Sequence, residues 1–430
     1  MRSFRRLLVF AFVAISATAL WGQQTMFPSV RGTREMVGAA NNLEVEAGFR
    51  ILTEGGNAVD AGVATVLTAA ATEESRFGLG GEMPLLVNMA GQPVVAISGV
   101  GVAPARATIE YFAHRQPEAW EDPQRMPPIP SEGIRAAITP GVFDGLILAL
   151  SRYGTMPFAK VAQPAIEAAE GFPLAEEFAH FLEIYQGIMR QWPTSTAYFY
   201  PTGVPLKRGD ILREPELVAT LRALSAVEKK THGNRQRKLR AVRDLFYKGS
   251  LAKRIAQFSE ENGGLISYDD LANFNADVEP PKSTTYRGYE IYKPGFWTQG
   301  PVMIEALNIL EGYDLKAMGH NSPRYLHTLI EAVKLAFADR DRYYGDPKFV
   351  KIPEAILLSK DYAAERRKLI DPEHASMESR PGDFAPPVAM RTGPVGAAIV
   401  NDTTCVNVVD RNGNGFSATP SGGWLPSVIA

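Results

Sequence analysis

Residues 402–420 read DTTCVNVVDRNGNGFSATP, and this stretch has the pattern of a β-hairpin. Apolar and polar residues alternate up to Val409, and the sequence Asp-Arg-Asn-Gly-Asn-Gly at 410–415 is typical of a turn. We therefore predict a strand over 397–409 and a partner strand over 416–419. The alternation directs Cys405 to the strand face opposite Thr404, where we expect it to be a small buried residue rather than a reactive thiol.

The dipeptide Asp402-Thr403 at the start of this hairpin also has a chemical use. Cleavage of the bond between them would give Thr403 a free α-amine, whose pKa of about 7.7–8 allows it to act as the base for the Thr403 hydroxyl. One residue then supplies both nucleophile and base, so this chemistry requires no metal and no cofactor. By itself the pattern is weak, since threonine is common in ordinary strands.

Upstream of the hairpin, the pattern predicts further elements. Residues 42–74 predict two helices, the first ended by Gly55-Gly56 and the second capped by Asn57 with Asp60 at its third position. Residues 85–89 and 94–97 predict a second hairpin.

Near the other end of the chain, Ser322-Pro323 begins a helix that ends before Gly345. We expect its buried stripe to consist of Leu326, Leu329, Ile330, Val333 and Phe337. Residues 376–397, rich in proline and glycine, predict a long, poorly packed connector.

The composition describes a globular chain with a sizeable core. Of 430 residues, 45% are hydrophobic and 21% are charged, so global disorder is excluded. The formal charge of −2 gives no reason to expect nucleic acid as a partner. A single cysteine excludes a disulfide framework, and the six histidines are scattered, so we expect no metal site.

Residues 1–23 have the pattern of a secretory signal peptide. Arg2, Arg5 and Arg6 precede an apolar run from Leu7 to Leu20, which is short for a membrane span. The alternative is a retained N-terminal anchor. We predict an exported protein, periplasmic or extracellular, with no stable membrane span once the signal is removed.

Several blocks, in order, resemble the γ-glutamyltransferase (glutathione hydrolase) family of N-terminal-nucleophile hydrolases. They cover most of the chain from about Asn41 to Ser421 and are residues 46–64, 138–173, 246–256, 262–274, 284–292, 307–315, 325–347 and 402–414. The resemblance implies an α/β (α+β) fold of the αββα type, with two antiparallel sheets between helical layers. It also implies a precursor that cuts itself into a large subunit (24–402) and a small subunit. Residues 403–430 are the first part of that small subunit. Because the family's small subunit is longer, we expect the chain to be a C-terminally truncated fragment, inactive alone and incomplete in one sheet.

The resemblance assigns roles to individual residues. Thr403 matches the family's nucleophile, Asp402 the last residue of the large subunit, and Ser421 a threonine whose hydroxyl contacts the nucleophile. Two positions of the substrate pocket depart from the family: Val100 replaces an arginine that grips the substrate α-carboxylate, and Gly423 replaces an asparagine on the amino side. The family's pocket loop is replaced by residues 293–301, where Phe296 and Trp297 could line an acyl pocket or pack in the core.

Three hypotheses about function follow. The first is an exported, self-processing enzyme that hydrolyses or transfers a γ-glutamyl group to water or an amine. The second is an acylase of the same fold with a different acyl group, since loss of an arginine clamp removes about 1.5–3 kcal/mol of carboxylate recognition. The third is a non-catalytic exported binding protein, against which the Asp402-Thr403 pair argues. In the first two, the partners are a small acyl-amide substrate, an acceptor, and the chain's own small subunit.

Overall fold

A six-stranded antiparallel sheet organises the chain, with the order β1-β9-β10-β2-β3-β6. The computed structural model describes residues 30–73, 76–118, 121–124, 126–130, 133–384 and 403–422, so the predicted signal peptide lies outside the described residues. The strands of the sheet are β1 (Met36–Gly38), β2 (Met83–Asn88), β3 (Val95–Gly99), β6 (Asp277–Glu279), β9 (Val406–Val409) and β10 (Gly415–Ala418). Both predicted hairpins, β2–β3 and β9–β10, are confirmed. The β9–β10 hairpin is inserted between β1 and β2, far from both in the sequence.

The two faces of the β9–β10 hairpin differ in burial. Val406, Val408, Phe416 and Ala418 are at most 1% exposed, whereas Asn407 and Ser417 on the other face are exposed. The buried face packs on α3 (Ala58–Thr72), where a Cβ added at Gly62 would lie 2.3 Å from the Phe416 ring. A glycine at this point of the helix therefore allows the hairpin to approach closely.

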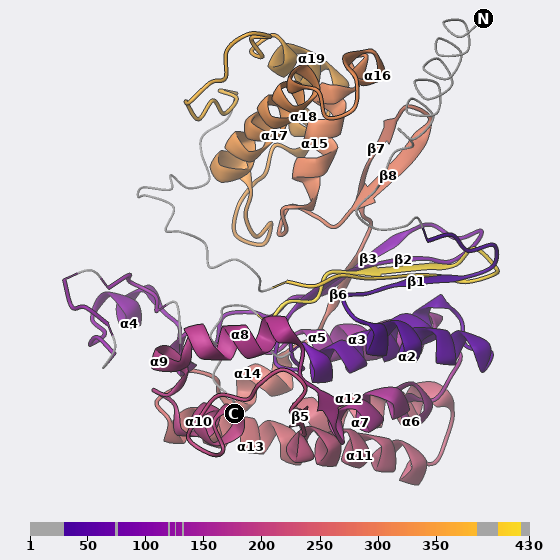
Figure 1. The fold of residues 1–430 in the computed structure, drawn as a ribbon, viewed down its shortest axis with the longest axis vertical. Helices are drawn as coiled ribbons and strands as arrows, with labels where there is room; N and C mark the ends of the chain where they lie inside the picture. Colours follow the sequence, from indigo (N-terminus) through magenta and orange to yellow (C-terminus); the bar gives the residue numbers. More distant parts are fainter. Residues whose placement is uncertain are drawn as a thin grey trace, which may run out of the picture.

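A layer of helices covers this buried face (Figure 1). The predicted helices at 42–74 are confirmed as α2 (Asn42–Thr53) and α3, and Asn57 with Asp60 forms the expected capping box. The remaining helices of this part of the chain are α4 (Ile109–Ala113), α5 (Val142–Tyr153), α6 (Phe158–Val161), α7 (Gln163–Ala169), α8 (Glu176–Ile184), α9 (Gln186–Met189), α10 (Pro193–Phe199), α11 (Pro215–Lys230), α12 (Arg235–Tyr247), α13 (Ser250–Glu261) and α14 (Tyr268–Asn273), with a short 3-10 turn at Ile134–Ala136. A minor sheet joins β4 (Phe172–Pro173) to β5 (Ile211–Leu212).

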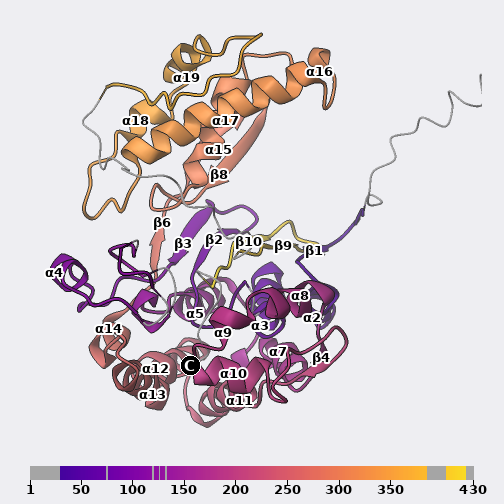
Figure 2. The same cartoon turned by 60° about the vertical axis from the view of Figure 1, so that its left-hand side comes forward.

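A second helical unit lies on the opposite side of the sheet (Figures 1 and 2). It begins with the hairpin β7 (Lys282–Tyr286) and β8 (Tyr289–Lys293), which follows β6 directly. Its helices are α15 (Gly300–Leu310), α16 (Leu315–Met318), α17 (Pro323–Tyr343), α18 (Glu354–Leu357) and α19 (Lys360–Arg367). This order of helices, sheet, strands and helices agrees with the expected sandwich of helices and antiparallel sheets. Within the described residues, the second strand layer consists of the β7–β8 hairpin alone.

The buried face of α17 differs from the prediction. The helix begins after its N-cap Ser322 as expected, but Leu326 is 41% and Ile330 55% exposed, whereas Glu331 and Asp339 are 1% exposed. The predicted stripe is therefore wrong at Leu326 and Ile330, whereas Leu329, Val333 and Phe337 are partly buried and pack against the core as expected. The reason is tertiary: α19 and the segment 371–384 supply partners for the charged residues that α17 buries beside its apolar ones.

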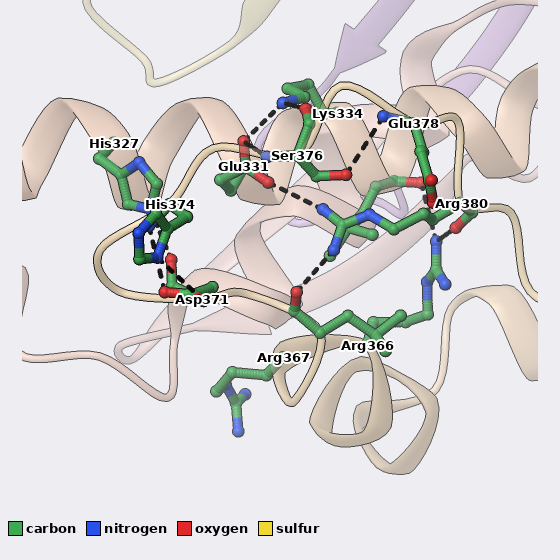
Figure 3. A network of polar contacts seen from close by, with 12 residues as sticks. His327, Glu331, Lys334, Arg366, Arg367, Asp371, His374, Ser376, Glu378 and Arg380 are labelled. Atoms are coloured by element: carbon green, nitrogen blue, oxygen red, sulfur yellow. Dashed lines mark hydrogen bonds and ion pairs between the residues drawn. The ribbon is translucent and has the colours of Figure 1, made fainter.

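Residues 371–384, which we call the strap, run along α17 and are well anchored (Figure 3). Glu331 accepts hydrogen bonds from Lys334 at 2.5 Å and from Arg380 at 2.8 Å. The Gly382 amide donates to Asp339 at 2.7 Å, and Phe384 stacks on Tyr343 with ring centroids 4.8 Å apart. Residues 376–384 contain no helix or strand, as predicted for a connector, but they are anchored at Arg380, Gly382 and Phe384 because side chains of α17 and α19 supply partners that no local pattern reveals.

No helix among the described residues combines the length and the hydrophobicity needed to cross a bilayer.

Candidate active site

Thr403 and Ser421 lie opposite each other, where the β9–β10 register continues beyond the ends of the two strands. Thr403 forms a bridge with Ser421, and the Thr404 amide donates to the Pro420 carbonyl at 3.0 Å. Residues directly opposite in antiparallel strands direct their side chains to the same face, about 5 Å apart. The structure thus brings together the two hydroxyl residues that the sequence singled out.

The same row of the sheet continues into β2 and β3. Ser421 bridges Glu82, with the Glu82 amide donating to the Ser421 carbonyl at 2.8 Å and the Ser421 amide donating to the Glu82 carbonyl at 2.9 Å. Because Met83 pairs with Gly99, continuing that register by one residue puts Val100 beside Glu82. Thr403, Ser421, Glu82 and Val100 therefore form one row across four strands, which we call the site row. Sequence reasoning missed Glu82, since only the strand pairing reveals it.

Close backbone packing holds the site row together. A Cβ at Gly81 would lie 2.2 Å from the Ser421 carbonyl oxygen, so no larger residue fits there without displacing Ser421. The Gly81 carbonyl also accepts hydrogen bonds from the Gly141 and Val142 amides, both at 3.1 Å. These bonds join the row to the start of α5.

Asp402 and Gly423 lie outside the described residues. The prediction that Asp402 takes part in processing, and the prediction that Gly423 occupies the family's asparagine position, therefore stay predictions.

The site row faces the side of the sheet turned away from α3. Thr403 and Cys405 are both exposed on this face, whereas Thr404 is 6% exposed on the other. The expectation that Cys405 is buried is wrong: the alternation predicted correctly that it lies opposite Thr404, but no described segment covers that face over Cys405.

Beneath the row, Thr404 lies near the carboxyl group of Glu73, the residue that caps the C-terminus of α3. Glu73 is 7% exposed, and neither Glu73 Oε2 nor Thr404 Oγ1 has a hydrogen-bond partner among the described residues within normal geometry. Burial raises the pKa of Glu73, while the nearby Thr404 hydroxyl and Arg76 guanidinium lower it in part. Arg76 Nη1 is 3.4 Å from Glu73 Oε1, and the guanidinium also pairs with Glu177, so its charge is already compensated.

A second buried carboxyl group, Glu44, adjoins this position. Glu44 is fully buried; its Oε2 accepts from the Ala40 amide and its Oε1 from the Thr72 hydroxyl, both at 3.1 Å. Burial, followed by the charge of Glu73, raises the pKa of Glu44 to about 8. Glu44 therefore carries a proton at neutral pH, which limits the repulsion between the two carboxyl groups.

The end of the row at Val100 is apolar. Val102 is 48% and Ile138 36% exposed, and the Thr139 amide donates to the Val102 carbonyl at 2.9 Å. No described side chain of the row supplies a cation where the family is expected to have its arginine. In the loop after β8, Phe296 is buried: it is 2% exposed and its ring packs on Tyr344. Of the two interpretations of Phe296, core packing is confirmed, and Trp297 donates to Glu279 at 2.6 Å.

Within the described residues, no group of three or more His, Cys, Asp and Glu side chains is arranged to hold a metal ion.

Comparison with known proteins places these features in a family context. A family model described as Gamma-glutamyltranspeptidase matches residues 45–426. The glutathione hydrolase proenzyme of Escherichia coli (strain K12) is 36% identical over 402 residues, which cover 92% of this chain and 64% of that protein. The acylase ACY 1 proenzyme of Pseudomonas sp. (strain SE83) is 35% identical over 390 residues, which cover 90% of this chain and 65% of that protein. The chain thus spans slightly less than two thirds of the length of these relatives.

Solved structures give the same relationship. The cephalosporin acylase from Bacillus halodurans superposes with a TM-score of 0.75 at 27% identity and covers 93% of this chain and 68% of its own. Helicobacter pylori gamma-glutamyltranspeptidase superposes with a TM-score of 0.72 at 28% identity, over 83% of this chain and 97% of its own.

Proposed function

This chain belongs to the gamma-glutamyltranspeptidase family, and from that membership we propose that it is part of a proenzyme that cleaves its own Asp402–Thr403 bond. Thr403 then acts as an N-terminal nucleophile that hydrolyses an amide or transfers its acyl group to an amine. Residues 24–402 form the large subunit, the small subunit begins at 403, and residues 1–23 direct export to the periplasm or the extracellular space.

The chemistry follows from one residue with two functional groups. The α-amine of Thr403 takes the proton of its hydroxyl group as Oγ attacks the amide carbonyl carbon. The carbon–nitrogen bond of the substrate breaks, the leaving amine takes the proton, and the acyl group remains as an ester on Oγ. Water or an acceptor amine then attacks the ester and releases Thr403. The Ser421 hydroxyl, one strand away, hydrogen-bonds to the nucleophile and orients it.

The observation that carries this proposal is the pairing of Thr403, which is exposed, with Ser421, which is 8% exposed, on the face of the sheet turned away from α3. Neither hydroxyl residue belongs to the face of the sheet that packs on α3 and forms the core. A purely structural hairpin end has no need for a threonine that follows an aspartate at this edge.

A second candidate differs in the acyl group. Val100 lies in the site row where the resemblance predicts a carboxylate-binding arginine, and its neighbour Val102 is also apolar and exposed. Acylases occur among the relatives as well as glutathione hydrolases. These two observations favour an acylase with an acyl group other than γ-glutamyl over a γ-glutamyltransferase.

Expression of the complete gene product with and without Thr403→Ala tests the nucleophile. We expect the wild type to yield two fragments, the smaller with Thr403 at its N-terminus, and the variant to remain one chain. Ser417→Ala is the control, because Ser417 also carries an exposed hydroxyl group on this face of the sheet, but it lies within β10 and bonds to Asn407 at 2.7 Å. A wild type that remains intact, or a Thr403→Ala variant that is still cleaved at this bond, contradicts the proposal and favours a binding protein.

A further inference from the structure

Glu82 lies in the middle of the site row, between Ser421 and the position of Val100. Both of its main-chain hydrogen bonds go to Ser421, at 2.8 and 2.9 Å, so its backbone is fixed relative to the hydroxyl residue beside the nucleophile. The residue after it, Met83, begins β2, whose register with β3 and β10 is continuous. Position and register of Glu82 therefore depend on the sheet, not on a mobile loop.

The side chain of Glu82 belongs to the same face as Thr403. Along β2, Met83, Leu85 and Val87 are at most 1% exposed and face the helices. Side chains alternate along a strand, so Glu82 is directed to the other face. Its partly exposed state agrees with this, because the face that carries Thr403 is the open one.

The separation of the two residues fits the length of a short acyl chain. Adjacent strands are about 4.8 Å apart, so the backbones of Thr403 and Glu82 lie roughly 10 Å apart across Ser421. A glutamate side chain spans several ångströms, so its carboxyl group can reach toward an acyl chain that lies along the row. A charged group some four atoms from the reacting carbonyl therefore falls within reach of Glu82.

The charge at this position is opposite to that of an arginine clamp. The site row contains one carboxylate, at Glu82, and an apolar residue at Val100. A carboxylate forms strong charge-assisted hydrogen bonds with an ammonium group and repels a second carboxylate. The site row therefore favours a substrate ammonium group, whereas a pocket for a γ-glutamyl group must bind a carboxylate as well as an ammonium group.

We propose that Glu82 is a specificity-determining residue that selects an acyl group carrying an ammonium group and no carboxylate. This inference rests on the proposed role of Thr403 and adds the class of substrate: an ω-aminoacyl amide rather than a γ-glutamyl amide.

Four p-nitroanilides of equal chain length separate the two charges. They are γ-glutamyl (ammonium and carboxylate), 4-aminobutanoyl (ammonium alone), glutaryl (carboxylate alone) and butanoyl (neither). With the complete, self-cleaved gene product we expect the highest kcat/KM for 4-aminobutanoyl and the lowest for glutaryl. Glu82→Gln should lower kcat/KM for 4-aminobutanoyl roughly 10- to 100-fold, the range for loss of one charged hydrogen bond, and lower it far less for butanoyl.

Two further variants make the test specific. Val100→Arg restores a cation to the row and should raise kcat/KM for glutaryl and γ-glutamyl relative to 4-aminobutanoyl. Glu290→Gln, the same chemical change on the β8 strand, where Glu290 bonds to Tyr292, should alter none of the four rates.

The outcomes distinguish this inference from the proposed function. Equal losses for all four substrates in Glu82→Gln indicate a structural role and overturn the inference, as does a wild type that prefers glutaryl or γ-glutamyl. A wild type that hydrolyses none of the four after cleavage at Thr403 overturns this substrate class but leaves the nucleophile in place. A wild type that is not cleaved at Thr403 overturns the proposed function itself.

Discussion

The two stretches on either side of residues 385–402 are held in place by different kinds of interaction. Downstream, residues 403–422 are held by main-chain pairing with β1 and β2 and by an apolar face on α3. Upstream, the strap is held by individual charged and polar side chains of α17 and α19 (Figure 3). A sheet register tolerates most single side-chain changes, whereas a polar anchor depends on each partner. The position of Thr403 should therefore be robust, and that of the strap sensitive to substitution.

The buried pair Arg366–Asp339 gives the strongest test of this contrast. Arg366 Nε is 3.3 Å from Asp339 Oδ2 with both side chains at most 5% exposed, and Arg366 also donates to the Arg380 carbonyl of the strap. Arg366→Met leaves a buried carboxyl group without its cation, so we expect a loss of about 3–5 kcal/mol in stability. Thermal unfolding measures this loss of stability, and limited proteolysis should cut the variant faster within residues 371–384.

The control for that variant is an exposed ion pair between α17 and the same strap. Arg342→Met removes the pair with Asp383, whose side chain is 89% exposed, and should cost less than about 1 kcal/mol. Equal effects of the two substitutions would show that burial does not decide the strength of the strap.

Below the strand end, Glu44 should make stability depend on pH. Its pKa of about 8 in the folded chain exceeds the ordinary value of 4.5. Between pH 4.5 and pH 8, the folded state therefore keeps a proton on Glu44 that the unfolded state has lost. The resulting stabilisation is complete below pH 4.5 and is lost as pH rises through 8, on the order of 2–3 kcal/mol between pH 6 and 8. Melting temperatures of wild type and Glu44→Gln from pH 6 to 9 test this, with a flatter profile expected for the variant. Glu46→Gln, an exposed change on the same helix, should keep the wild-type slope.

The contact between Glu73 and Thr404 should influence how well Thr403 is positioned for processing. We expect Glu73→Gln and Thr404→Val each to slow the proposed cleavage at Thr403 about tenfold, because each changes one of the two buried polar groups that lie close together where the start of β9 meets the end of α3. The double variant should be no slower than either single one, and Thr404→Ser should restore the rate.

Additive effects of the two substitutions would contradict a shared contact. Glu177→Gln serves as the control, because Glu177 pairs with the outer side of Arg76 and its side chain is 65% exposed.

The smallest effect is expected at Cys405, on the open face beside Thr403. Cys405→Ser should change stability by less than about 0.5 kcal/mol, because the side chain is exposed. In the 430-residue chain the thiol should react with a maleimide without denaturant. Slow labelling of the native chain would show that the open face is covered.

The sequence by itself determined the local elements and the identity of the candidate nucleophile. The capping box at Asn57 and Asp60, the β9–β10 turn and the N-cap Ser322 depend on residues a few positions apart, whose preferences survive in any fold. Thr403 and Ser421 were found because the resemblance covers the segment that contains them. Local pattern and resemblance together therefore yielded the elements and three of the four residues of the site row, Thr403, Ser421 and Val100.

Only the tertiary structure decided which face of each element is buried and which distant residues meet. The exposure of Leu326 and Ile330, the burial of Glu331 and Asp339, and the exposure of Cys405 all depend on what packs against the element, which periodicity alone does not specify. Glu82 enters the site row only because the β9–β10 hairpin pairs with β2, more than 300 positions earlier in the chain. Hydrogen-bond register between such distant segments is a property of the whole sheet, and for that physical reason no local stretch of sequence contains it.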